Sequence, residues 1–120
     1  MTAVRPDRSL QPSLAGVDVL EDLPLHDAVV ESVSLDWTTG ELHVVVSPVG
    51  PGELFVLSFR DVSSVEIPRE MPWGRSSSIN AARTLSPSGF ELEMQSGDTW
   101  RIQAARWVYG GPVNHEAKPA

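Results

Sequence analysis

The chain has 120 residues, of which 41% are hydrophobic, a length that allows one ordinary core and excludes two. It has no cysteine, which excludes disulfides, thiolate zinc sites and cysteine nucleophiles. The net charge is −7, and the sequence contains no cluster of Lys or Arg that could displace counterions from nucleic acid. No apolar run approaches the roughly 20 residues that span a bilayer. We therefore expect a cytoplasmic protein that has neither nucleic acid nor a membrane as a partner.

Both ends of the chain are predicted to be flexible. Residues 1–16 and 110–120 contain too few apolar side chains to offset the entropy of ordering them. A single β domain is expected over residues 17–109. At its start, residues 17–23 predict either a short helical turn or an edge strand, because apolar residues recur three apart and Pro24 ends either element.

The region that follows alternates apolar and polar residues, which is typical of half-buried strands. In the strand expected over 29–37, Val29 lies on the core face and Val30 on the opposite face. The next strand, 41–47, completes a hairpin whose loop is either 39–40 or 38–41, because only an even number of loop residues keeps the two apolar sets on one face. Further strands are predicted at 54–59 and 65–67, with a Pro/Gly turn before the first of them.

The last part of the domain predicts an amphipathic hairpin after a short strand at 81–85. Its strands, 90–95 and 99–104, alternate apolar and polar residues. Two registers keep the apolar faces together: one places Glu93 opposite Arg101, and the other places Glu91 opposite Arg101. We favour the second, because it puts Gly97 at the loop position that requires a left-handed backbone.

These segments predict a mainly β fold with little helix, in which a single antiparallel sheet of about six strands curls into an open barrel or a sandwich. The predicted core consists of the inward-facing apolar residues of the strands: Val33, Leu35, Trp37, Leu42, Val44, Val46, Phe55, Leu57, Phe59, Leu92, Met94, Trp100 and Ile102.

His26 and Asp27 form a pair that resembles a catalytic or metal-binding signature. A hydrolase built on such a pair needs further His and Asp ligands, and the sequence offers only His43, on a predicted strand, and His115, in the predicted tail. The structural interpretation is that Asp27 caps backbone donors in the turn before the first strand while His26 packs at the domain edge. We therefore expect no metal, no cofactor and no catalytic residue.

The longest irregular stretch, residues 68–80, contains Trp73 between a proline and a glycine, with Arg69, Arg75 and Asn80 nearby. Loops of this length are often functional, and Trp with Arg is enriched at binding hot spots. Two interpretations stay open: a recognition surface, or a plug in which Trp73 closes one end of the β layer.

The order of several motifs is similar to that of small uncharacterised bacterial β domains and of immunity proteins that neutralise toxins by direct binding. The motifs are "LHDA" from residue 25, "LSFRDVSSVEI" from 57, "PWG" from 72, "SIN" from 78 and "LEMQSGDTWRI" from 92. The resemblance covers residues 25–106 and supplies no active-site residue. It implies an antiparallel domain that acts by protein contact.

The sequence thus predicts a non-catalytic, immunity-like protein-binding module whose partner is another protein or a second copy of the chain. The candidate binding residues are His26, Asp27, Arg69, Trp73, Arg75 and Asn80. The first alternative is a β-barrel that binds a small ligand at its mouth, which a concave apolar pocket with convergent polar groups would indicate. A hydrolase that uses His26 and Asp27 is the third candidate.

Overall fold

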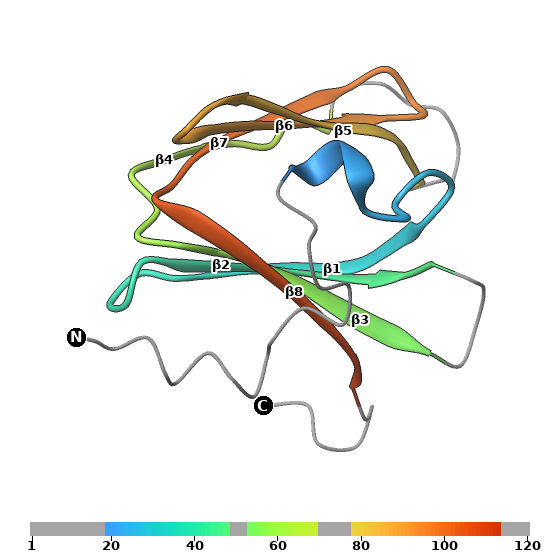
Figure 1. The fold of residues 1–120 in the computed structure, drawn as a ribbon, viewed down its shortest axis with the longest axis horizontal. Coiled ribbons are helices and arrows are strands. Elements are labelled where there is room, and N and C mark those ends of the chain that lie inside the picture. Colours follow the sequence, from blue (N-terminus) through green and yellow to red (C-terminus); the bar gives the residue numbers. More distant parts are fainter. Residues whose placement is uncertain (1–18, 49–52, 70–77, 114–120) are drawn as a thin grey trace.

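The computed structural model describes residues 19–48, 53–69 and 78–113 (Figure 1). The elements in these ranges are a 3-10 helix η2 (Leu20–Asp22) and the strands β1 (Val29–Asp36), β2 (Glu41–Ser47), β3 (Leu54–Arg60), β4 (Ser64–Glu66), β5 (Ile79–Ser86), β6 (Gly89–Met94), β7 (Thr99–Gln103) and β8 (Arg106–Val113). The leader predicted at 1–16 lies outside the described residues.

The strands form two antiparallel sheets that face each other as the two layers of Figure 1. One sheet has the order β1-β2-β3-β8 and the other the order β4-β7-β6-β5. The prediction of a mainly β, antiparallel fold with little helix is confirmed. The prediction of a single sheet of about six strands is wrong, because the chain divides its strands between two four-stranded sheets, which do not close into a barrel.

The first corner of the fold is a pair of strands that passes from one sheet into the other. β3 pairs with β8 in the first sheet, and their continuations β4 and β7 pair in the second. Two backbone hydrogen bonds hold the bend: Ala105 N–H to the oxygen of Arg60, at 2.9 Å, and Ser63 N–H to the oxygen of Gln103, at 2.8 Å. Asp61 takes a left-handed backbone conformation there, with φ of 55°. Such a bend allows one pair of antiparallel segments to continue from the first sheet into the second.

The second corner joins the beginning of β1 to the beginning of β5. Backbone hydrogen bonds of 2.8 Å link Asp27 N–H to the oxygen of Ile79 and Ile79 N–H to the oxygen of Ala28, and Val29 forms a bridge with Ser78. β1 therefore begins beside β5, at one edge of the second sheet.

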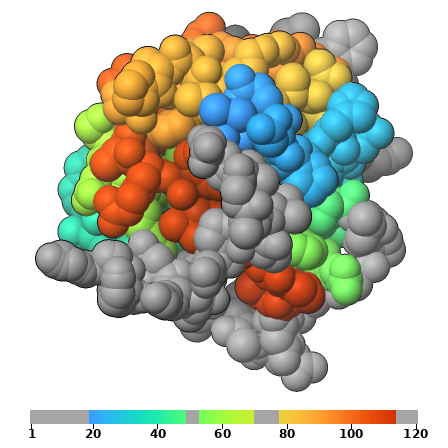
Figure 2. All heavy atoms as spheres, in the orientation of Figure 1, coloured from blue at the N-terminus to red at the C-terminus, as the bar shows by residue number. Residues whose placement is uncertain are grey.

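The helix η2 covers the outer edge of β5. Leu20 is completely buried, its N–H donates to Thr84 Oγ1 at 3.0 Å, and Glu21 Oε1 accepts the N–H of Thr84 at 2.9 Å. Hydrogen bonding by its own backbone N–H, and then by Thr84, lowers the pKa of Glu21. Figure 2 shows the atoms of residues 19–28 (blue) against those of β5 (yellow-orange). Of the two elements predicted for 17–23, the helical turn is the one observed.

A bulge changes the phase of β1. The pairing with β2 shifts between Val30 and Ser32, so that Val30 lies opposite the buried Val46 and packs against the core. Val29, which the alternation placed inside, is instead 38% exposed. The single extra residue, Glu31, reverses the faces of the residues before it.

Most of the predicted core is confirmed. Nine of its residues are buried: Leu42, Val44, Val46, Leu57, Phe59, Leu92, Met94, Trp100 and Ile102. Val33 and Phe55 are partly buried against them. The predictions for Leu35 and Trp37 are wrong, since their exposed fractions are 40% and 86%.

The predicted register of the last hairpin is confirmed, because Glu91 lies opposite Arg101. Met94 N–H donates to the oxygen of Asp98 at 2.8 Å, and Gly97 in the loop has a left-handed φ of 105°. The loop therefore has the geometry that requires a glycine.

Charged side chains on the outer face of the second sheet neutralise one another. Arg83 on β5 contacts Glu93 at 2.7 Å and Glu91 at 3.0 Å, and Arg101 on β7 lies 3.6 Å from Glu91 and 3.7 Å from Glu66. The hydrogen bond from Arg83 lowers the pKa of Glu93. In turn, the hydrogen bonds to Glu93 and, to a smaller extent, to Glu91 raise the pKa of Arg83. Cross-strand pairing accounts for these charges.

β8 was not predicted from the sequence, and it includes residues 110–113 of the predicted tail. It adds Trp107 and Tyr109 to the core side of the first sheet, opposite Phe59 and Leu57. The rings of Phe55 and Tyr109 stack with centroids 5.4 Å apart. The Tyr109 hydroxyl is buried with no hydrogen-bond partner among the described residues, and burial raises its pKa to about 12.

We expect the free energy of unfolding to fall between pH 10 and 12, because the unfolded chain ionises its tyrosine at about 10 while the folded chain keeps Tyr109 neutral. The stabilisation is fully present below pH 10 and decreases by up to about 1.4 kcal/mol per pH unit above it. Tyr109→Phe should remove this pH dependence and leave neutral-pH stability equal or up to about 1 kcal/mol higher. Tyr109 is the sole tyrosine in the sequence, so ultraviolet titration reports it directly. A folded-state midpoint near 10 would contradict the prediction.

Candidate functional site

The structure describes four of the six predicted binding residues. Trp73 and Arg75 lie outside the described residues, and Arg69 is exposed after β4. Asn80, on β5, donates from Nδ2 to Glu93 Oε2 at 3.1 Å. The backbone carbonyl oxygen of Asn80 lies 2.8 Å from Nδ1 of His26. The structure thus brings His26 and Asn80 together.

His26 and Asp27 form the turn that enters β1. Asp27 has a left-handed φ of 71°, and its Oδ1 accepts a hydrogen bond from Gln95 Nε2 and lies 3.6 Å from His26 Nε2. Asp27 therefore accepts a hydrogen bond from a side chain that follows β6 in the second sheet. The prediction was that it would cap backbone donors of its own turn. Both side chains are 68% exposed, and no group of three or more His, Cys, Asp or Glu side chains able to hold a metal occurs among the described residues. The pair is a solvated turn.

A second polar cluster lies on the outer face of the first sheet, where His43 links Ser58 to Glu41. His43 Nδ1 is 2.9 Å from Ser58 Oγ, and Nε2 is 3.3 Å from Glu41 Oε1. This is the order of groups in a serine nucleophile with its base and orienting acid. Ser58 is completely buried, however, so a substrate cannot reach Oγ. The contact between His43 and Ser58 instead connects the neighbouring strands β2 and β3. Sequence reasoning missed it because the partner of a strand histidine depends on register.

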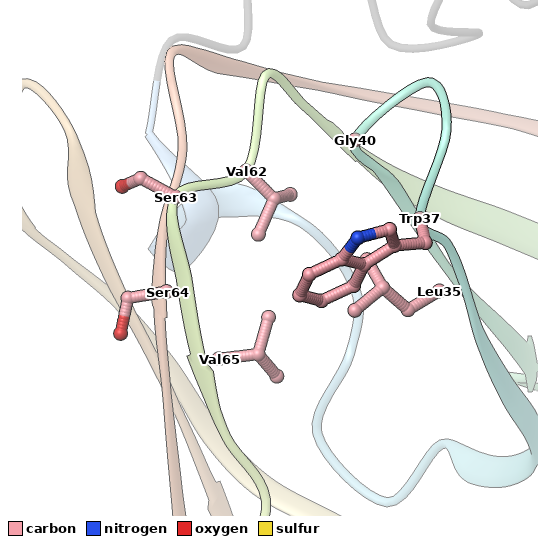
Figure 3. A pocket seen from close by; sticks show the side chains of 7 residues that line it. All are labelled: Leu35, Trp37, Gly40, Val62, Ser63, Ser64 and Val65. Atoms are coloured by element: carbon pink, nitrogen blue, oxygen red, sulfur yellow. The ribbon is translucent and has the colours of Figure 1, made fainter.

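The open side of the molecule carries an apolar groove, which we call the Trp37 groove. It encloses about 400 Å³ between the β1–β2 turn and β4. It is lined by Leu35, Trp37, Gly40, Val62, Ser63, Ser64 and Val65. Figure 3 shows the Trp37 indole and the side chains of Leu35, Val62 and Val65 pointing toward one another, while Ser63 and Ser64 point away. The groove therefore has apolar walls.

The groove exists because β1 ends beside the short strand β4. β1 begins at β5, one edge of the second sheet, and ends at β4, the other edge, so it crosses that sheet. β4 has three residues and cannot cover the end of β1. Leu35 faces inward opposite the buried Leu42, yet it remains 40% exposed.

The turn that carries Trp37 is fixed by hydrogen bonds. Asp36 Oδ1 accepts the N–H groups of Thr38 at 3.0 Å and Thr39 at 3.2 Å, and the Asp36 carbonyl oxygen accepts Gly40 N–H at 2.8 Å. Val62 N–H donates to the oxygen of Gly40 at 2.9 Å, which ties the turn to the β3–β4 corner. The loop has four residues, 37–40, so its even length was predicted correctly but its position was wrong by one residue.

The side of the groove that β1 forms is acidic. Glu31 and Asp36 on β1 are exposed, and the sequence has no Lys or Arg between Arg8 and Arg60. Across the groove, Asp61 pairs with Arg106 at 3.2 Å, which offsets its charge. The β1 side is therefore the negative side.

No family model, curated protein or solved structure matches the chain. Among the residues with a described structure, no helix has the length and apolar character needed to cross a bilayer. Function is therefore inferred from the geometry of the groove.

We expect Trp37→Ala to change the free energy of unfolding by no more than about 0.5 kcal/mol, because the side chain is 86% exposed. Gly40→Ala should cost about 1 kcal/mol or more, since Gly40 has a left-handed φ of 73°. Chemical denaturation of both variants tests the pair. A loss above about 2 kcal/mol for Trp37→Ala would show that the indole supports the fold.

Proposed function

We propose that this protein is a non-catalytic protein-binding module that holds its partner at the Trp37 groove. The observation that carries the proposal is a tryptophan 86% exposed on a turn fixed by hydrogen bonds. Tryptophan is enriched at binding hot spots, and a turn whose backbone is fixed before binding loses little entropy on association.

The distribution of exposed apolar side chains supports the same surface. Four large apolar residues are exposed in the described ranges: Val29, Leu35, Trp37 and Leu85. Three of them belong to β1 or to the turn that follows it. Leu35 and Trp37 lie together in the groove, whereas Val29 lies at the other end of β1 beside β5. Adjacent exposed apolar side chains indicate an interaction surface, whereas scattered ones do not.

An immunity-like role is one form of this proposal. The resemblance in the sequence implies neutralisation by contact, which requires a binding surface and no catalytic group. The Trp37 groove supplies such a surface, and its acidic side favours a basic partner.

A small ligand in the same groove is the second candidate, because a volume of about 400 Å³ lies within the usual range for ligand pockets. The ligand would lie between the edges of the two sheets. The predicted barrel mouth is not the site, since the sheets do not close into a barrel.

The proposal is tested by capture from cell extract with three baits: the native protein, Trp37→Ala and Leu85→Ala. Leu85 is 55% exposed on β5, at the opposite edge of the second sheet from β4, and serves as the matched control. We expect a protein that the native and Leu85→Ala baits retain and that Trp37→Ala binds about 30-fold more weakly, which corresponds to about 2 kcal/mol.

Equal capture by all three baits would contradict the proposal. If Trp37→Ala instead lost a small molecule detected by native mass spectrometry, with no change in captured proteins, the second candidate would replace the first.

A further inference from the structure

We propose, on the basis of the protein-binding function above, that the partner supplies an extended basic segment. This segment adds to the first sheet as a strand beside β1 and places aliphatic side chains in the Trp37 groove. The inference rests on the edge geometry of β1, the direction of its side chains and its charge.

The outer edge of β1 is the best suited of the described sheet edges to receive a strand. β1 is the terminal strand of its sheet, and residues 32–36 pair with β2 without interruption after the bulge. Backbone N–H and C=O groups along such an edge are available for pairing. At the other edges, β4 has three residues, Glu21 occupies the N–H of Thr84 on β5, and β8 contains Pro112, which has no N–H.

The side chains of β1 determine what the added strand must carry. Residues opposite one another in neighbouring strands share a face. A residue added beside Leu35 would therefore point into the groove, where Trp37, Val62 and Val65 provide apolar contacts. Residues beside Ser34 and Asp36 would point to solvent on the outer face. The matching segment alternates aliphatic and polar residues.

Charge selects a basic segment and disfavours a second copy of this chain. β1 carries Glu31 and Asp36 and no basic residue. Two β1 strands paired with each other would bring together only acidic and neutral side chains, and like charges across a strand pair are destabilising. Lys or Arg at the solvent-facing positions of the partner would lie near the carboxylates.

The probe is a capped eight-residue peptide in which Val alternates with Lys, added to the full chain at low salt and followed by amide NMR. We expect shifts at residues 32–36 and at the Trp37 indole N–H. A matched peptide with Glu in place of Lys should bind at least about tenfold more weakly. N-methylation of the backbone amides that would face β1 should weaken binding by a similar factor, because it removes the ladder hydrogen bonds.

Two doubly substituted proteins test the charge contribution. Glu31→Gln with Asp36→Asn removes the carboxylates of β1 while an Asn oxygen can still accept from Thr38 and Thr39. Asp22→Asn with Glu53→Gln removes the same net charge at exposed positions away from the groove. We expect the first protein to bind the Val-Lys peptide about five- to tenfold more weakly and the second to bind it as the native chain does.

The outcomes separate this inference from the proposed function. Equal binding of the Lys and Glu peptides, shifts that avoid 32–36, or no binding of the Val-Lys peptide would overturn strand addition by a basic segment. If a partner is nevertheless captured in a Trp37-dependent manner, the protein-binding function stands. Loss of that capture as well would remove both.

Discussion

The crossing of the two sheets is the constraint on which the rest of the structure depends. Backbone hydrogen bonds fix it at two corners, one from β3 and β8 to β4 and β7 and the other between β1 and β5. A sandwich tied at these corners buries the inner faces of both sheets and remains open where β1 ends beside β4. The groove therefore results from the lengths of β1 and β4, at a side of the sandwich that the described residues cover loosely. Trp37 lies there because the turn after β1 extends beyond the core.

Local alternation identified much of this fold in the sequence. β2, β6 and β7 alternate buried and less buried residues along most of their length, so their inward residues were predicted correctly. In β3 the inward Leu57 and Phe59 were also predicted correctly, although Ser58 between them is buried too. The register of the last hairpin could be predicted because Gly97 accepts a conformation that other residues resist. β8 escaped prediction because Gly110, Gly111 and Pro112 interrupt the pattern, although pairing with β3 holds that segment in a strand.

The site was less predictable, since it depends on interactions between distant segments. β1 contains a bulge between Val30 and Ser32 that no residue type in the sequence indicates. The bulge reverses the faces of the residues before it, and Val29 is therefore exposed. Trp37 continued the apolar phase and was assigned to the core, although Asp36 before it and Gly40 after it are typical of a four-residue turn. That Val62 and Val65 would lie across from Trp37 follows only from the β3–β4 corner, which has no local signature.

The contact between Glu21 and Thr84 has a consequence for assembly. It occupies a backbone donor of β5, one of the four terminal strands in the described part of the molecule, and so makes that edge less able to pair with a further strand. If strands add at β1 alone, the molecule is monofunctional in the sense of polymer chemistry, because each copy offers one site for a partner strand and cannot link two partners. Complexes made through β1 would have a fixed stoichiometry, and fibrous growth through successive sheet edges would be terminated at the first step.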